Sequence, residues 1–133
     1  TLISAYIKKL LGHIKGIYIF QILIYDMYSK DLIRGTLRTI VLKLLTENGR
    51  MYGYEITLKV KELSGNEISL TFGALYPTMY KLEKEGMVYT TEEVVDHRTR
   101  KYYHLTSEGT ETARKKIDEY FAFAHTMNLI MSS

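Results

Sequence analysis

The residues of this sequence that could do chemistry are tyrosines, lysines and arginines rather than groups that catalyse reactions. The four histidines (His13, His97, His104 and His125) fall in separate segments with no carboxylate at metal-ligand spacing, and the chain has no cysteine. No phosphate-cradling glycine loop and no nucleophile motif occurs. The sequence therefore predicts no enzyme, no metal site and no cofactor, and leaves contacts to an anionic polymer as the chemistry that these side chains suit.

Such side chains gather between Thr71 and Gly86, a segment that is predicted to be a helix. Within it Leu75, Met79 and Leu82 are spaced four and then three residues apart. At about 100° per residue they share one helical face, which should point into a core. Thr71 can cap the start of this helix, and Gly86 can end it.

The opposite face of this helix carries Gly73 and Pro77 one turn apart. A proline inside a helix costs roughly 3 kcal/mol, because it lacks an N–H and its ring clashes with the carbonyl one turn back. Here that carbonyl belongs to a glycine, so the pattern favours a backbone that a nucleic-acid groove approaches closely. The alternative is an ordinary surface helix with a kink. The residues predicted to contact DNA on this helix are Thr71, Gly73, Tyr76, Pro77, Tyr80, Lys81 and Lys84.

Length and composition are consistent with one domain, or one domain with an appendage. Hydrophobic residues make up 46% of the 133 residues, which is ample for a core. The net charge of +3 permits an anionic partner without requiring one. Because the chain has no cysteine, disulfides and thiolate metal sites are excluded. A reducing cytosol fits, and we expect a cytoplasmic protein.

Residues 1–26 stand apart from the rest of the chain. Their apolar run, Ile17 to Tyr25, is too short for a membrane-spanning helix, which needs about 20 residues. Lysines precede the run as in a signal peptide, but no small-residue cleavage site follows it. Three interpretations remain: an extra N-terminal helix on the core, a weak membrane anchor, or a segment absent from the natural protein. We favour the third, with Met27 as the true start, and expect no membrane role.

A helix is predicted from Asp31, which can cap it, to Asn48-Gly49, which can end it. Its apolar stripe has helical spacing and should face the core. The stripe consists of Ile33, Leu37, Ile40, Val41, Leu44 and Leu45.

A second helix should open near Tyr52 and run to about Leu63, after a short connection at Arg50-Met51. Residues 64–67 have the composition of a turn. Residues 68–70 either form a very short strand or simply lead into the helix that begins at Thr71. Two helices, a short loop and a third helix make a helix-turn-helix arrangement.

A β-hairpin is predicted after Gly86, because the apolar period changes from 3.6 to about 2. Its strands are Met87 to Val94 and Arg100 to Leu105, joined by residues 95–99. Three cations near the tip form a local positive knob, which either contacts phosphates or the minor groove or is a solvated cluster that protects the strand edge. These cations are Arg98, Arg100 and Lys101.

The last helix is predicted to begin with Thr106 as its N-cap and to carry a wide apolar face. A surface helix on its own domain needs an apolar face only about 100° wide. The excess suggests packing against another chain, and the alternative is burial under residues 1–26. The predicted interface residues are Ile117, Tyr120, Phe121, Ala124, Met127, Ile130 and Met131.

The motifs of this winged helix-turn-helix resemble those of the PadR family of bacterial transcriptional regulators. The resemblance covers roughly residues 27–127, and the combination of strings is more specific than any single one. The strings are Arg34-Gly35-Thr36-Leu37, Tyr52-Gly53-Tyr54-Glu55-Ile56, Gly73-Ala74-Leu75-Tyr76-Pro77, Leu82-Glu83, Glu85-Gly86, Arg98, Arg100-Lys101-Tyr102-Tyr103, Leu105-Thr106 and Gly109.

The resemblance implies a homodimer with the last helix as dimerisation arm, and repression of a nearby promoter. It also implies release from DNA by a small hydrophobic effector or by a signal sensed at the dimer interface. Residues 1–26 have no counterpart in the family pattern. His97 and Thr99 stand at the hairpin tip where Gly and Pro are common. Some relatives stack flat drugs on interface tryptophans, a mode that a chain without Trp does not share.

The expected fold is mostly α with a small β-hairpin, in the α+β class. Residues 27–105 should form the DNA-binding domain and 106–133 the dimerisation helix. Each subunit would insert Thr71–Lys84 into a major groove, with half-sites ~34 Å apart. Tyr52, Gly53 and Tyr54 would offer helix-start N–H groups to a phosphate. The alternative function is a protein-interaction module without specific DNA binding.

Overall fold

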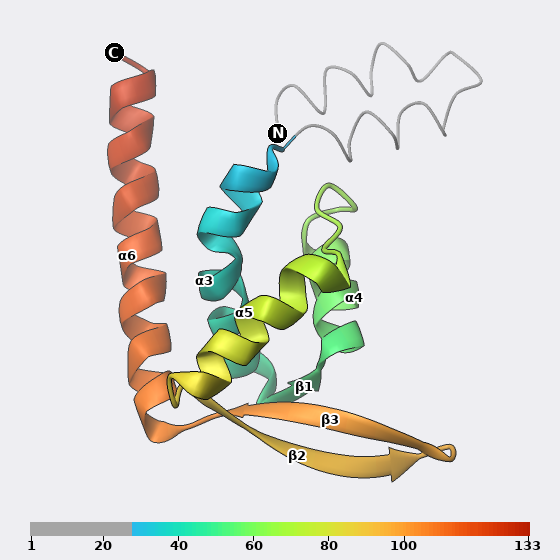
Figure 1. The fold of residues 1–133 in the computed structure, drawn as a ribbon. Helices are drawn as coiled ribbons and strands as arrows, with labels where there is room; N and C mark the ends of the chain where they lie inside the picture. Colours follow the sequence, from blue (N-terminus) through green and yellow to red (C-terminus); the bar gives the residue numbers. More distant parts are fainter. Residues whose placement is uncertain (1–27) are drawn as a thin grey trace, which may run out of the picture.

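The computed structural model describes residues 28–133, which form four helices and one three-stranded antiparallel sheet (Figure 1). The α+β winged helix predicted from the sequence is confirmed. Expectations for residues 1–26 lie outside the described residues. The elements are α3 (Lys30–Asn48), β1 (Arg50–Tyr52), α4 (Gly53–Leu63), α5 (Phe72–Lys84), β2 (Val88–Val95), β3 (Arg98–Leu105) and α6 (Ser107–Met131).

The first helix, α3, begins one residue before the predicted cap. The side chain of Ser29 accepts a hydrogen bond of 3.2 Å from the Leu32 N–H, so Ser29 is the N-cap and the assignment of Asp31 was wrong. Asp31 instead lies in the first turn, where its charge suits the positive end of the helix dipole. The helix ends as predicted at Gly49, whose φ of 78° suits a glycine.

The segment after α3 is a strand and not the short connection that we expected. In β1, Met51 pairs with Tyr103 of β3, and β3 lies between β1 and β2 in the sheet. A strand of three residues is too short to show alternation in the sequence, and its pairing partner lies some fifty residues further along the chain. The pairing fastens the hairpin to the helices.

The third helix, α5, has the predicted ends and the predicted inner face. Thr71 caps it by accepting a 3.2 Å hydrogen bond from the Ala74 N–H. Gly86, with φ 77°, follows its last turn. Its three large aliphatic residues are fully buried among side chains of the core. They are Leu75, Met79 and Leu82.

The hairpin is longer and its turn tighter than predicted. Each strand has eight residues, and only Asp96 and His97 lie between them. Their φ angles of 51° and 63° are those of a type I′ turn, which matches the twist of paired strands. Asp and His tolerate this left-handed region better than most residues do, but they give a weaker sequence signal than Asn-Gly.

The last helix, α6, leaves the sheet at a tightly packed junction. Thr106 caps it by accepting from the Gly109 N–H, and its own hydroxyl donates to the Gly86 carbonyl at 2.6 Å. Ala113 is fully buried near the start of α6, which runs antiparallel to α3 (Figure 1). Further along, large apolar residues of α6 are exposed, including Phe121 at 65% and Phe123 at 61%.

Candidate nucleic-acid interface

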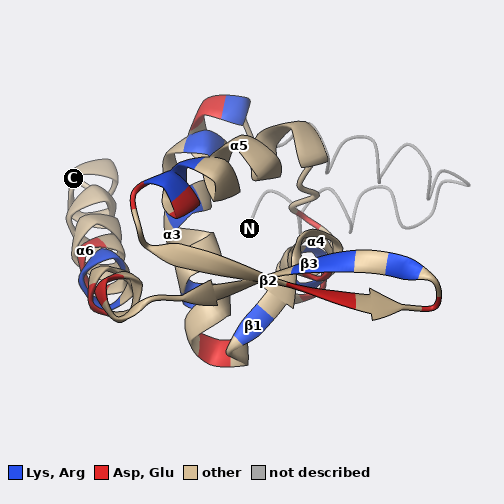
Figure 2. Ribbon diagram, turned by 60° about the horizontal axis from the view of Figure 1, so that its bottom comes forward, with Lys and Arg blue, Asp and Glu red and all other residues tan. Residues whose placement is uncertain are grey.

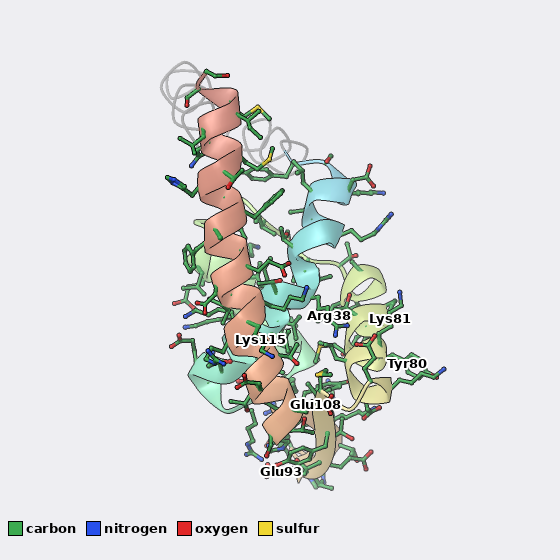
Figure 3. All side chains as sticks on the ribbon, turned by 90° about the vertical axis from the view of Figure 1, so that its left-hand side faces the viewer. Arg38, Tyr80, Lys81, Glu93, Glu108 and Lys115 are labelled. Atoms are coloured by element: carbon green, nitrogen blue, oxygen red, sulfur yellow. The ribbon has the colours of Figure 1, made fainter. Side chains whose placement is uncertain are left out.

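The outward face of α5 is the central feature of the site. Gly73, Pro77, Lys81 and Lys84 are exposed, and Tyr80 keeps 63% of its surface in solvent. Figure 3 shows Tyr80 and Lys81 pointing away from the body of the molecule. Because the inner face of the same helix is fully buried, these residues are held in a fixed direction by the core.

The end of α5 is tied to neighbouring elements through its carboxylates. Arg38 of α3 lies 2.5 Å from the Glu85 carboxylate, and the hydrogen bond from Arg38 lowers the pKa of Glu85. Glu83 lies 3.9 Å from the Lys101 ammonium of β3. These contacts hold α5 against both α3 and the hairpin.

Tyr76 lies against the start of α4. A Cβ placed on Gly53 would come within 2.6 Å of the Tyr76 hydroxyl, so the tyrosine ring occupies the space that this buried glycine leaves open. Phe72 continues the contact, with its ring 5.6 Å from that of Tyr76 and 6.5 Å from that of Tyr54. The sequence pattern did not single out Phe72. Its signal was its place directly after the N-cap, where helix-turn-helix proteins contact bases.

The start of α4 is where we expect helix N–H groups to meet a phosphate. The Tyr52 N–H donates to the Glu55 carboxylate at 3.2 Å, so this amide is already satisfied within the protein. Glu55 stands three residues after the N-cap, where an acidic side chain can reach back to it. Gly53 is buried under Tyr76, and only Tyr54, at 52%, is well exposed. The Tyr52 amide is thus bonded within the protein and Gly53 is covered by Tyr76, and a phosphate contact at this helix start stays a prediction.

The three hairpin cations do not form one positive knob. Arg98 is exposed beside the turn, whereas the Arg100 guanidinium lies 4.6 Å above the Tyr52 ring. Lys101 points to the opposite face of the sheet, near Glu83. Strand alternation causes this separation.

Acidic residues on β2 oppose these cations. Glu92 pairs in register with Lys101 and Glu93 with Arg100, and Figure 2 shows the acidic stretch of β2 beside the basic stretches of β3. Arg50 hydrogen-bonds Glu93 at 2.6 Å, which lowers the pKa of that carboxyl. The charge of the hairpin is therefore mixed.

The predicted interface residues of α6 lie along the part of the helix that stands clear of the sheet (Figure 1). Tyr120, Phe121, Ile130 and Met131 are exposed, with 73% for Met131. Ile117, Ala124 and Met127 are half-buried. An apolar groove of about 400 Å³ lies between α3, α4 and α6, a feature that sequence spacing alone did not indicate. Its apolar lining is Ile40, Leu44, Val60, Leu63, Ile68, Ile117, Tyr120 and Phe121.

Comparison with known proteins decides the family. The sequence profile of the transcriptional regulator PadR-like family matches residues 41–115. An uncharacterized protein of Lysinibacillus sphaericus is 32% identical over 106 residues, which cover 79% of this chain and 96% of that protein. This chain belongs to the PadR family.

Solved structures of transcriptional regulators share the fold. A transcriptional regulator from Clostridium thermocellum has a TM-score of 0.68 and 31% identity, covering 77% of this chain and 96% of its own. A PadR family regulator from Eggerthella lenta has a TM-score of 0.64 and 28% identity, covering 77% and 88%. As a PadR family member, the protein is a transcriptional regulator, and this membership implies DNA binding.

The PadR match runs from the middle of α3 through α4, α5 and the hairpin into the first turns of α6. The candidate interface thus falls inside the matched segment, and the apolar far half of α6 falls outside it. Among residues 28–133, no group of three His, Asp or Glu could hold a metal ion. None of the helices within residues 28–133 combines the length and the hydropathy that a membrane span requires.

Proposed function

We propose that this PadR family protein is a dimeric, sequence-specific repressor that inserts α5 into the major groove. The observation that carries the proposal is the division of α5 into a fully buried face and an exposed face with aromatic, lysine and glycine-proline surface. Tyr80 then contacts base edges or sugars, and Lys81 and Lys84 contact phosphates. We place the protein in the cytoplasm, where a bacterial promoter lies.

Gly73 supports a close approach of DNA to the helix backbone. Among residues 28–133, the nearest atom to a Cβ at this position would be the Thr71 hydroxyl oxygen, at 3.9 Å. Packing within the described part of the chain therefore does not require a glycine here, although glycine in a helix costs about 0.5–1 kcal/mol relative to alanine. The glycine is accounted for if DNA occupies the space that a side chain would fill.

The hairpin supplies the second contact in this proposal. Arg98 is exposed at its tip, and Arg100 is held on the Tyr52 ring. Both suit the flanking phosphates or the minor groove. Lys101, close to Glu83, contributes less because part of its charge is already matched.

The exposed apolar face of α6 supports a homodimer. Its large side chains would cost less free energy if buried against a second copy than if left in water. The groove between α3, α4 and α6 offers an apolar site for a small hydrophobic effector that changes the dimer and releases DNA.

The test is salt-dependent binding of the full chain to the DNA upstream of its own gene, located first by footprinting. With about 6 to 10 phosphate contacts, affinity should fall roughly 10³- to 10⁵-fold between 50 and 200 mM salt. A flat salt response, or no preference over unrelated DNA of equal length, would contradict the proposal.

A protein-interaction module is the second candidate, and the mixed charge of the hairpin favours it. Arg50 already forms an ion pair with Glu93, and Lys101 lies close to Glu83, so both cations have partners within the protein. The double change Arg98→Ala and Arg100→Ala separates the two functions. Regulation that survives a complete loss of DNA affinity would support the interaction module.

A further inference from the structure

Phe72 is an apolar side chain at the start of the helix that we propose for the major groove. It is the first residue of α5 and keeps 49% of its surface exposed. In helix-turn-helix proteins the first turn of this helix contacts base edges. A phenylalanine there offers neither a donor nor an acceptor, so it cannot read the polar groups of a base.

Two tyrosines hold the Phe72 ring in place. The rings of Tyr54 and Tyr76 lie 6.5 Å and 5.6 Å from it and are tilted by 52° and 37°. All three rings are about half exposed, at 52% for Tyr54 and 45% for Tyr76. They form one exposed aromatic row, which we call the Phe72 row, where the start of α5 lies beside α4 (Figure 1).

The Phe72 row is anchored through Tyr76, the ring that packs on the start of α4. The Tyr76 hydroxyl fills the space over the buried Gly53, so the ring cannot move inward. A rigid apolar surface binds a small apolar group at low cost, because its side chains lose little freedom on binding.

The major groove offers one apolar group, the C5-methyl of thymine, and phenylalanine is among the side chains that contact it. We propose that Phe72, held by Tyr54 and Tyr76, reads the methyl group of a thymine in each half of the operator. This inference rests on the proposed function and adds a base preference to it. Tyr54 and Tyr76 act as positioning residues.

The experiment replaces each dT of the footprinted operator by dU, one position at a time, which removes only the methyl group. For the wild-type chain, the dT-to-dU change at one symmetry-related pair of positions should weaken binding by about fourfold per methyl. This factor corresponds to the free energy of burying one methylene-sized group. The Phe72→Ala variant should bind the dT operator about tenfold more weakly and show no difference between dT and dU at those positions. Phe72→Leu, which keeps an apolar side chain, should retain part of the difference.

Circular dichroism and the salt dependence of binding show that the variants fold and still bind phosphates. If the wild-type chain binds the operator specifically but no dU position weakens binding, the inference is overturned and the proposed function stands. It is also overturned if Phe72→Ala shows the same dU effect as the wild type. If the wild-type chain binds no DNA specifically, the proposed function itself fails.

Discussion

Three glycines differ in the space around them, and this difference distinguishes a glycine that folding requires from one that DNA binding would require. A Cβ on Gly109 would lie 1.9 Å from the Met87 carbonyl oxygen, which is backbone. A Cβ on Gly53 would come within 2.6 Å of the Tyr76 hydroxyl, which is packed over this glycine. A Cβ on Gly73 would meet nothing closer than 3.9 Å. The first glycine is required by the fold, the second by the position of Tyr76, and the third by no contact within the described chain.

Gly109→Ala should destabilise the protein by about 1–3 kcal/mol or more, because the added methyl overlaps backbone that cannot move away cheaply. Urea unfolding followed by circular dichroism measures the change. Gly35→Ala is the matched control, since a Cβ there meets no atom of residues 28–133 within 4 Å. Equal stability of the two variants would show that the junction between β2 and α6 is looser than described.

Gly73→Ala should have the opposite profile, with better stability and weaker DNA binding. Alanine improves helix propensity by about 0.5–1 kcal/mol, and the position has room for it. The methyl group would stand between α5 and the groove, so we expect operator affinity to fall at least about tenfold, by roughly 1.4 kcal/mol or more. Gly35→Ala should gain similar stability and keep full affinity. Retained affinity in Gly73→Ala would remove the argument for close approach.

At the scale of elements, the helices could be predicted because their apolar spacing repeats over several turns. Leu75, Met79 and Leu82 were enough to orient α5, and all three are fully buried. The cap of α3 was misplaced because Ser29 and Asp31 are both good capping residues, and only the hydrogen bond from Leu32 distinguishes them.

The sheet and the site were less predictable because they depend on contacts between distant residues. β1 has three residues and is recognised only by its pairing with β3. The three hairpin cations do not form one cluster, because strand alternation places Lys101 on the face opposite Arg98 and Arg100. The sequence does not show that Glu83 and Glu93 lie near Lys101 and Arg50. Phe72 was missed because its sequence signal, the place directly after the N-cap, does not show that the side chain stays exposed in the folded chain.

Within the hairpin, Arg98→Ala should reduce binding more than Lys101→Ala does. Arg98 is exposed, whereas the Lys101 ammonium lies 3.9 Å from Glu83. Loss of one phosphate contact should reduce the steepness of the plot of log K against log salt by about 0.9. It should also weaken binding to all DNA sequences alike. Arg114→Ala on α6 is a control of equal charge change, at a side chain that is 64% exposed. An unchanged slope for Arg98→Ala would exclude the hairpin tip from the contact.

At the scale of the whole molecule, the candidate DNA surface and the exposed part of α6 are separate features (Figure 3). The PadR match ends at residue 115, so the family profile covers the DNA surface and leaves out the far half of α6. This half carries Phe121, Phe123 and Met131, all more than 60% exposed. A dimer joined through α6 would let its two α5 helices bind two half-sites at once. This linkage raises the affinity for the operator even though each half-site makes the same contacts as before.

Phe121→Glu tests whether α6 joins two copies. The side chain is 65% exposed, so a carboxylate there is solvated in the single chain and should leave its fold intact. In a dimer the same charge would be buried without a partner, which is costly. We expect sedimentation to show monomer where the wild type is dimer, and operator affinity to fall by about 10²-fold or more because the two half-sites are no longer linked. Ala122→Glu, on a different side of the same turn, should remain dimeric. A monomeric wild type that binds its operator with full affinity would rule out the arm, and a dimeric Phe121→Glu would move the interface to another surface.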